Sequence, residues 1–179
     1  MTTQQANRTK PYPVAKQLAT PMDLSLQEVQ AITEVINPLV ADAFALYVKT
    51  KNFHWHLSGS HFRDYHLLFD EQAEQIFGSI DLLAERVRRI GGLTIHSIGQ
   101  ISQLQTIKDD DEAFVPAGEM VRRLMEDNAH IAHLQREAHE VCDKNRDVAT
   151  ASILENIIDE TERRKWFLFE VYQGISNTD

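Results

Sequence analysis

Four residues with metal-binding side chains recur as two pairs within residues 62–90. His66 and Asp70 are four residues apart, and so are Asp81 and Glu85. In an α-helix, which turns by about 100° per residue, the members of such a pair lie on one face, one turn apart. Asp70 and Asp81 are about three full turns apart, so all four side chains fall within an arc of about 100°. Histidine and carboxylate ligands together suit first-row metals such as iron, zinc or manganese better than calcium or magnesium.

The two pairs are too far apart to share one metal site within a single chain. Asp70 and Asp81 are separated by about 16 Å along the helix axis, at about 1.5 Å per residue. Two metal ions bridged in one site are only about 3.5–4 Å apart. A second copy of the helix, antiparallel across a two-fold axis, would bring opposite pairs together, with Ala73 and Phe77 in the contact. We therefore predict two identical metal sites per dimer, each built between subunits.

A fifth candidate ligand, His54, comes from the segment before this stretch. The turn Ser58-Gly59-Ser60 is so short that the helices on either side of it must form an antiparallel hairpin. This hairpin brings His54 close to His66. His56 falls on another side of its helix. We expect it at the surface, or in contact with a ligand rather than with the metal ion.

Other histidines and aromatic residues are open to simpler interpretations. Three histidines share a later predicted helix: His130, His133 and His139. They do not lie on one line, so we favour solvated or interface positions over a metal site. His61 and Asp64 sit at the hairpin turn and suit helix capping. Trp55 and Trp166 are expected in the core or at an interface, and Trp55 would be within electron-transfer reach of an iron site at His54.

Helical periodicity accounts for most of the chain. It predicts four long helices, over residues 26–57, 62–90, 116–143 and 148–173. Ser25 and Glu28 form a capping box, Pro38 should bend or interrupt the first helix, and Gly91-Gly92 and Gly174 should stop the second and the last. The long connection over residues 93–115 should cross the molecule and join two parallel helices. The predicted fold is all-α: a ferritin-like four-helix bundle whose crossover contains a short helix, with no fifth helix.

Length and composition bound the class of protein. At 179 residues the chain suits one domain, which we divide into a flexible N-terminal arm (1–24), the bundle (25–174) and a short C-terminal tail (175–179). The net charge of −9 argues against a body that binds nucleic acid non-specifically. The single Cys142 excludes an internal disulfide and suits a reducing cytosol. No apolar run approaches the roughly 18 residues of a membrane span, and the N-terminus lacks the apolar stretch of a secretion signal, so we expect a cytoplasmic protein.

The segment KNFHWHLSGSHFRDYHLLFDEQ, followed by DLLAERVRRIGG, resembles the signature of the Dps family, the mini-ferritins also known as DNA-binding proteins from starved cells. The similarity extends from about residue 24 to residue 172. It implies an iron-oxidising site at a dimer interface, with five ligands: His54, His66 and Asp70 of one subunit, and the partner's Asp81 and Glu85. No Glu in the chain is followed three residues later by His, which sets it apart from ferritins with the site inside one subunit.

The resemblance also implies an assembly and an activity. The expected particle is a hollow homo-oligomer of twelve subunits built from two-fold dimers. It would oxidise Fe(II) with hydrogen peroxide or oxygen and store the ferric mineral, which protects DNA from oxidative damage. The alternative function is that of a nucleoid-binding structural protein, with iron oxidation secondary.

Two positions depart from the family pattern. Family members line their three-fold pores with acidic residues near the start of the last helix, where this chain has Ser152, although Asp143, Asp147 and Glu155 lie nearby. Members that bind DNA often use a lysine-rich terminal arm. Here the arm carries three basic residues: Arg8, Lys10 and Lys16. The sequence therefore leaves both the route of iron ions and DNA binding open.

Overall fold

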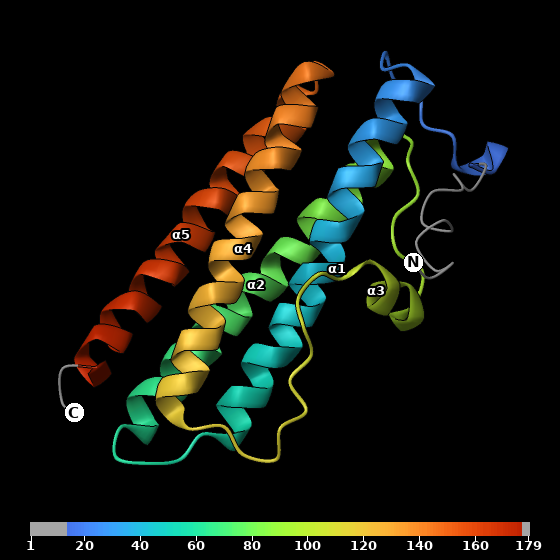
Figure 1. Ribbon diagram of the computed structural model, residues 1–179. Helices are drawn as coiled ribbons and strands as arrows, with labels where there is room; N and C mark the ends of the chain where they lie inside the picture. Colours follow the sequence, from blue (N-terminus) through green and yellow to red (C-terminus); the bar gives the residue numbers. More distant parts are fainter. Residues whose placement is uncertain (1–13, 177–179) are drawn as a thin grey trace, which may run out of the picture.

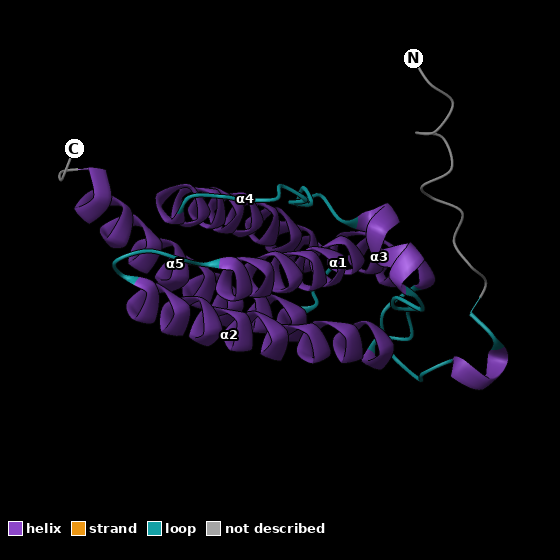
Figure 2. Cartoon of the chain, turned by 90° about the horizontal axis from the view of Figure 1, so that it is seen from below, coloured by secondary structure: helices purple, strands orange, loops and turns teal. Residues whose placement is uncertain are grey.

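Four long helices form the body of the protein, which was analysed as a computed structural model that describes residues 14–176. The described elements are η2 (Lys16–Leu18), α1 (Leu26–His56), α2 (Phe62–Arg89), α3 (Ile98–Leu104), α4 (Ala117–Lys144) and α5 (Val148–Ser176). Two antiparallel hairpins, α1–α2 and α4–α5, lie side by side, with α1 against α4 and α2 against α5 (Figure 1). The short α3 lies outside the four long helices, next to α1 (Figure 2).

The prediction that the fold has no fifth helix is wrong, because residues 14–176 contain five α-helices. The helix that makes the count five is α3, the short helix expected within the crossover, where the Ser97 hydroxyl caps the helix by accepting a hydrogen bond from the backbone N–H of Gln100 at 3.2 Å. Gly174 also fails to stop α5, which continues to Ser176. Ile175 lies against Gly118 of α4, so packing between the helices extends α5 beyond the glycine. A glycine weakens a helix by only about 1 kcal/mol, which such packing can offset.

The predicted start of α1 and end of α2 are confirmed. The side chains and backbone N–H groups of Ser25 and Glu28 bond each other reciprocally in a capping box. Gly91 adopts a φ of +87°, the left-handed conformation that ends many helices and that glycine reaches without strain. A Cβ on Gly92 would lie 2.3 Å from the Thr33 hydroxyl of α1, so only glycine permits this close approach.

Pro38 does not interrupt α1, contrary to one of the two outcomes expected for it. The helix is continuous from Leu26 to His56 with Pro38 inside it. The missing N–H would have bonded the carbonyl of Glu34, and Glu34 is exposed, so water can supply the lost partner.

The crossover runs along the length of the bundle, from the end of α2 to the start of α4, so these two helices are parallel as predicted (Figure 1). A buried carboxylate on α1 holds it in place. Asp42 accepts hydrogen bonds from the backbone N–H groups of Thr106 (2.5 Å) and Ile107 (3.0 Å) and from the Thr106 hydroxyl (2.8 Å). One side chain thus satisfies three donors of the connection.

Two further features of the core bear on the sequence predictions. Within the described residues, α1 is long and apolar enough to cross a membrane by length and composition, although no such segment was expected. Its fully buried residues, among them Ile32, Ile36 and Phe53, belong to the core of the bundle, which accounts for this apolar character. Cys142 is fully buried in the same core, and burial raises the pKa of its thiol to about 12.

Replacing Asp42 by Ala should lower the free energy of unfolding by about 3 kcal/mol, because two backbone N–H groups, one of them on the buried Ile107, lose a charged acceptor. Urea denaturation followed by circular dichroism measures the change. Glu34→Ala, on the exposed side of the same helix, is the matched control and should cost less than about 0.5 kcal/mol. A loss in Asp42→Ala no larger than that of the control would show that other contacts hold the crossover.

Candidate metal centre

His54 and His66 face each other across the α1–α2 hairpin, as predicted. Their rings are stacked, with centroids 3.7 Å apart and an interplanar angle of 19°. His54 Nδ1 lies 2.8 Å from the carbonyl oxygen of His66, and His66 Nδ1 lies 3.0 Å from the carbonyl oxygen of His54. A carbonyl can only accept, so both Nδ1 atoms carry the proton and donate. In the neutral form of each imidazole, Nε2 then keeps its lone pair and can bind a metal ion.

Asp70 lies beside the two imidazoles, but it is closer to Lys51, a residue that was not predicted from the sequence. Asp70 Oδ1 is 3.8 Å from His54 Nε2 and 2.6 Å from Lys51 Nζ. The hydrogen bond from the Lys51 ammonium is the main cause that lowers the pKa of Asp70, against a smaller opposing effect of burial. Lys51 is three residues before His54 in α1, and this spacing on one helix face is the signal that could have found it.

Asp81 and Glu85 lie further along α2, and both are exposed. Glu85 forms an exposed ion pair with Arg89, one turn on, at 2.5 Å. Because α2 is continuous, Asp81 is about 16 Å from Asp70 along the axis. In residues 14–176 no three His, Cys, Asp or Glu side chains of the single chain are grouped closely enough to hold a metal ion. The assignment of the five ligands to a site shared by two subunits therefore stays a prediction.

The face of α2 that carries the acidic residues continues onto α1 as a partly apolar surface. Phe77, between Asp70 and Asp81, is 55% exposed, and its ring contacts that of Tyr47. Ala73, in contrast, is fully buried in its own subunit and is not available for the contact predicted for it. On α1, Val48 (58% exposed) and Trp55 (63% exposed) flank Lys51 on one helix face. We call the surface formed by Val48 and Trp55 of α1 and Phe77 of α2 the outward face.

Trp55 is thus exposed rather than in the core, and the same holds for Trp166, at 58%. An interface position for either stays a prediction. His56 is exposed as expected, with Nδ1 2.9 Å from the carbonyl oxygen of Asn52. His61 occupies the N-cap position of α2, but its side chain makes no capping hydrogen bond. The capping prediction is therefore correct for its position and wrong for its side chain.

The three histidines of α4 have separate partners. His130 Nε2 is 2.8 Å from the Thr106 hydroxyl, His133 pairs with Glu137 at 3.3 Å, and His139 pairs with Glu155 at 3.2 Å. They do not converge, in agreement with the interpretation favoured from their spacing.

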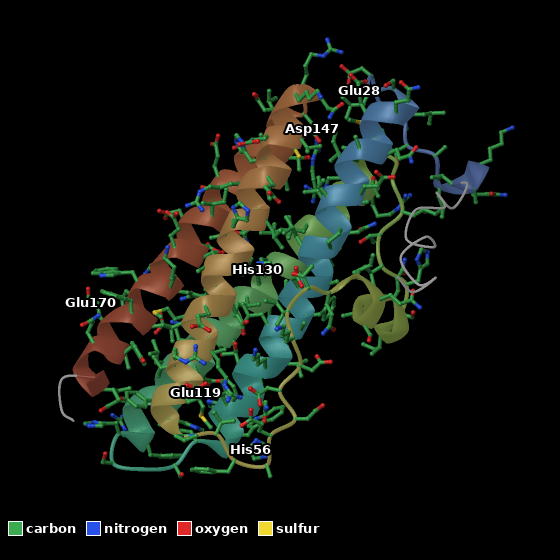
Figure 3. All side chains as sticks on the ribbon, in the orientation of Figure 1. Glu28, His56, Glu119, His130, Asp147 and Glu170 are labelled. Atoms are coloured by element: carbon green, nitrogen blue, oxygen red, sulfur yellow. The ribbon has the colours of Figure 1, made fainter. Side chains whose placement is uncertain are left out.

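Asp147 does not line a route for ions, although it was considered for one. Its side chain is 2% exposed, caps α5 through the backbone N–H of Thr150, and pairs with Arg86 of α2 at 2.5 Å. Figure 3 shows it at the end of the bundle opposite to His56. Ser152 and Asp143 are exposed, as is Glu155. Of the basic residues of the arm, Lys16 lies in η2 and is exposed, whereas Arg8 and Lys10 lie outside the described residues.

Comparison with known proteins places this geometry in context. Residues 33–177 match the family described as Ferritin-like domain. A "DNA protection during starvation protein" from Brevibacillus brevis is 35% identical over 147 residues, covering 82% of this chain and 97% of the relative. "DNA protection during starvation protein 1" from Deinococcus radiodurans is 30% identical, covering 81% of this chain and 70% of the relative. The crystal structure of a Dps protein from Bacillus brevis is similar with a TM-score of 0.79 at 32% identity, covering 83% and 99% of the two chains.

Replacing Lys51 by Met should raise the pKa of Asp70 and tighten the binding of Co(II), a spectroscopic probe, about fivefold at neutral pH, because a competing cation is removed. In acid the effect on Co(II) binding reverses. The Lys51 ammonium lowers the pKa of Asp70 in the wild type, so this carboxylate stays charged to a lower pH than in the variant. The variant therefore loses a charged ligand at a higher pH. Co(II) titration by visible absorbance and a carboxyl ¹³C titration measure both effects. Lys144→Met is the control, and equal affinities in both variants would contradict a role of Lys51 at the site.

Proposed function

Because the chain belongs to the Dps family of ferritin-like proteins, we propose that it oxidises Fe(II) at sites shared between two subunits and stores the ferric product in a hollow homo-oligomer. The observation that carries this proposal is the orientation of His54 and His66. Both rings are held through Nδ1, which leaves Nε2 of the neutral imidazole for a metal ion, and His54 Nε2 lies 3.8 Å from Asp70 Oδ1. Two imidazoles and a carboxylate are a donor set that suits Fe(II). The set is incomplete within one chain, and the same face of α2 carries two more carboxylates, Asp81 and Glu85.

The proposed reaction consumes two substrates that damage DNA when they meet. Two Fe(II) ions give one electron each to one hydrogen peroxide, and two protons complete two water molecules, so no hydroxyl radical is released. His54 and His66 would bind one iron ion together with the partner's Glu85. Asp70 and the partner's Asp81 would hold the second more weakly, since they offer fewer ligands, so that this ion exchanges and supplies the mineral.

The outward face supports the pairing of two subunits across α2. Val48, Trp55 and Phe77 expose apolar surface next to the Lys51–Asp70 ion pair. Exposed apolar residues around polar groups are typical of protein contact surfaces. An antiparallel copy would cover this face and supply the missing carboxylates in one step. We propose that such dimers assemble into a shell of twelve subunits in the cytoplasm.

Protection of DNA follows from the chemistry, whether or not the protein binds DNA. Two relatives are named for protection of DNA during starvation, which supports this role here. The second candidate, a structural protein of the nucleoid, would require a basic surface. The net charge of −9 opposes it. A gel shift with linear DNA at low and physiological salt distinguishes the two functions.

Complementation between two inactive variants tests the shared site. His66→Ala/Asp70→Ala removes one half and Asp81→Ala/Glu85→Ala removes the other, so each variant alone should lose rapid Fe(II) oxidation. After mixing and refolding, half of the dimers are heterodimers with one intact site of two, which predicts about a quarter of the wild-type activity. The assay is an anaerobic Fe(II) titration followed by peroxide, with two Fe(II) consumed per peroxide.

Mass spectrometry of isotope-labelled subunits is the control for exchange in this experiment. No recovery despite confirmed heterodimers would rule out a site shared in this way. Full activity of Asp81→Ala/Glu85→Ala alone would remove both residues from the site.

Replacing Phe77 by Asp should reduce the native mass from about twelve chains to single chains, because it places an unpaired charge in the proposed contact. Multi-angle light scattering measures the mass, and circular dichroism verifies that the helices remain. Leu26→Asp is the control: Leu26 is 88% exposed at the start of α1, where an acidic residue is tolerated. A fully assembled Phe77→Asp variant would place the contact elsewhere.

A further inference from the structure

Arg164 of α5 is buried inside the bundle without an acidic partner. It is 5% exposed. Its Nε donates to Asn128 Oδ1 at 3.1 Å, and its Nη2 donates to Thr161 Oγ1 at 2.8 Å. Both acceptors are neutral, and among the described residues no carboxylate forms an ion pair with this guanidinium. Two of its five N–H donors are therefore used, and neither bond compensates the charge.

The side chains packed around Arg164 are amides and hydroxyls. Gln72 of α2 is buried and donates to the Arg164 carbonyl at 3.2 Å, and Asn128 of α4 is buried as well. Bundles that hold metal ions inside one subunit place Glu and His at such interior positions. Here a fixed positive charge takes their place. This interior repels a divalent cation and attracts an anion.

A recess of about 10 Å³ lies between α2 and α5, and Arg164 is one of the residues that line it. Its polar lining includes Arg164, Gln72, Gln75 and a second cation, Arg163, whose guanidinium carbon is 5.4 Å from the centre of the Phe167 ring. The volume corresponds to about one water-sized particle. The recess thus combines a small space, two guanidinium groups and amide donors.

One carboxylate, that of Glu71, also lines the recess. It accepts a hydrogen bond from Gln75 at 3.2 Å and makes no ion pair with Arg164. Glu160, one turn before Arg164 on α5, is exposed and acts on the guanidinium through its charge without forming an ion pair. The buried guanidinium therefore has no directly bonded countercharge among the described residues. Burial lowers the pKa of Arg164 to about 10, so the guanidinium is still charged at neutral pH. A buried charge of this kind is normally paired.

We propose that the recess between α2 and α5 binds a monatomic anion of the halide class, such as chloride, in contact with the guanidinium of Arg164. The space is close to one water molecule in volume, which favours a monatomic anion over a larger oxoanion such as phosphate. The anion supplies the countercharge that the neutral hydrogen bonds of Asn128 and Thr161 do not.

Thermal unfolding of the assembled protein in sodium chloride and in sodium gluconate, at equal ionic strength, tests the proposal. The wild type should show a saturable rise of Tm with chloride. Arg164→Met should abolish this rise. The control is Arg63→Gln, which removes an exposed arginine of α2 outside the recess and should retain the rise. Glu71→Gln removes a negative charge from the recess and should lower the chloride concentration at half-saturation about threefold.

Crystals soaked in bromide provide a measurement that does not depend on the folding of Arg164→Met. An anomalous peak in contact with the Arg164 guanidinium, in the wild type and in Glu71→Gln, is the expected result. Absence of this peak, or equal Tm values of the wild type in chloride and gluconate, would overturn the proposal. Stabilisation by phosphate but not by chloride would overturn the assignment to a monatomic anion.

Discussion

The candidate metal centre depends on two hydrogen bonds that connect its histidines to each other's backbone. The carbonyl of His54 belongs to the last turn of α1, where no later N–H of the helix reaches it. The ring of His66 satisfies this carbonyl, and the ring of His54 bonds the carbonyl of His66 in return. This pair of hydrogen bonds joins the two helices at the hairpin turn, where the rings are stacked, and selects the neutral tautomer that leaves both Nε2 atoms available. The ligands are oriented by the fold before any metal ion arrives.

Four acidic residues of this chain illustrate two kinds of surroundings. Asp42 and Asp147 are buried, and each satisfies several donors that join a connection or a helix start to the bundle. Asp81 and Glu85 are exposed on α2, and none of the described contacts gives them a comparable structural role. Buried carboxylates with complete hydrogen bonding stabilise the fold, whereas exposed ones on a common face remain available to cations. The separation explains why an acidic chain can place charge at a site without weakening its core.

Local patterns were sufficient to predict the long helices, because their signals lie within a few residues of each other. The capping box at Ser25, Gly91-Gly92 and the short hairpin turn are of this kind, and they placed His54 opposite His66. Features set by contacts between distant segments were not predictable in the same way. The extension of α5 past Gly174 and the burial of Asp147 both depend on such contacts. The ligand pattern did not predict Lys51, because an ammonium group does not bind metal ions. Only its spacing of three residues from His54 on one helix face indicates that it belongs to the site.

The depth of Cys142 has a consequence for the peroxide chemistry proposed here. Peroxide attacks the thiolate form of cysteine, and both burial and the raised pKa keep this residue protonated. The sulfur is therefore shielded from sulfenic acid formation and from cross-linking between subunits. In the proposed reaction this thiol would therefore not compete with Fe(II) for the oxidant.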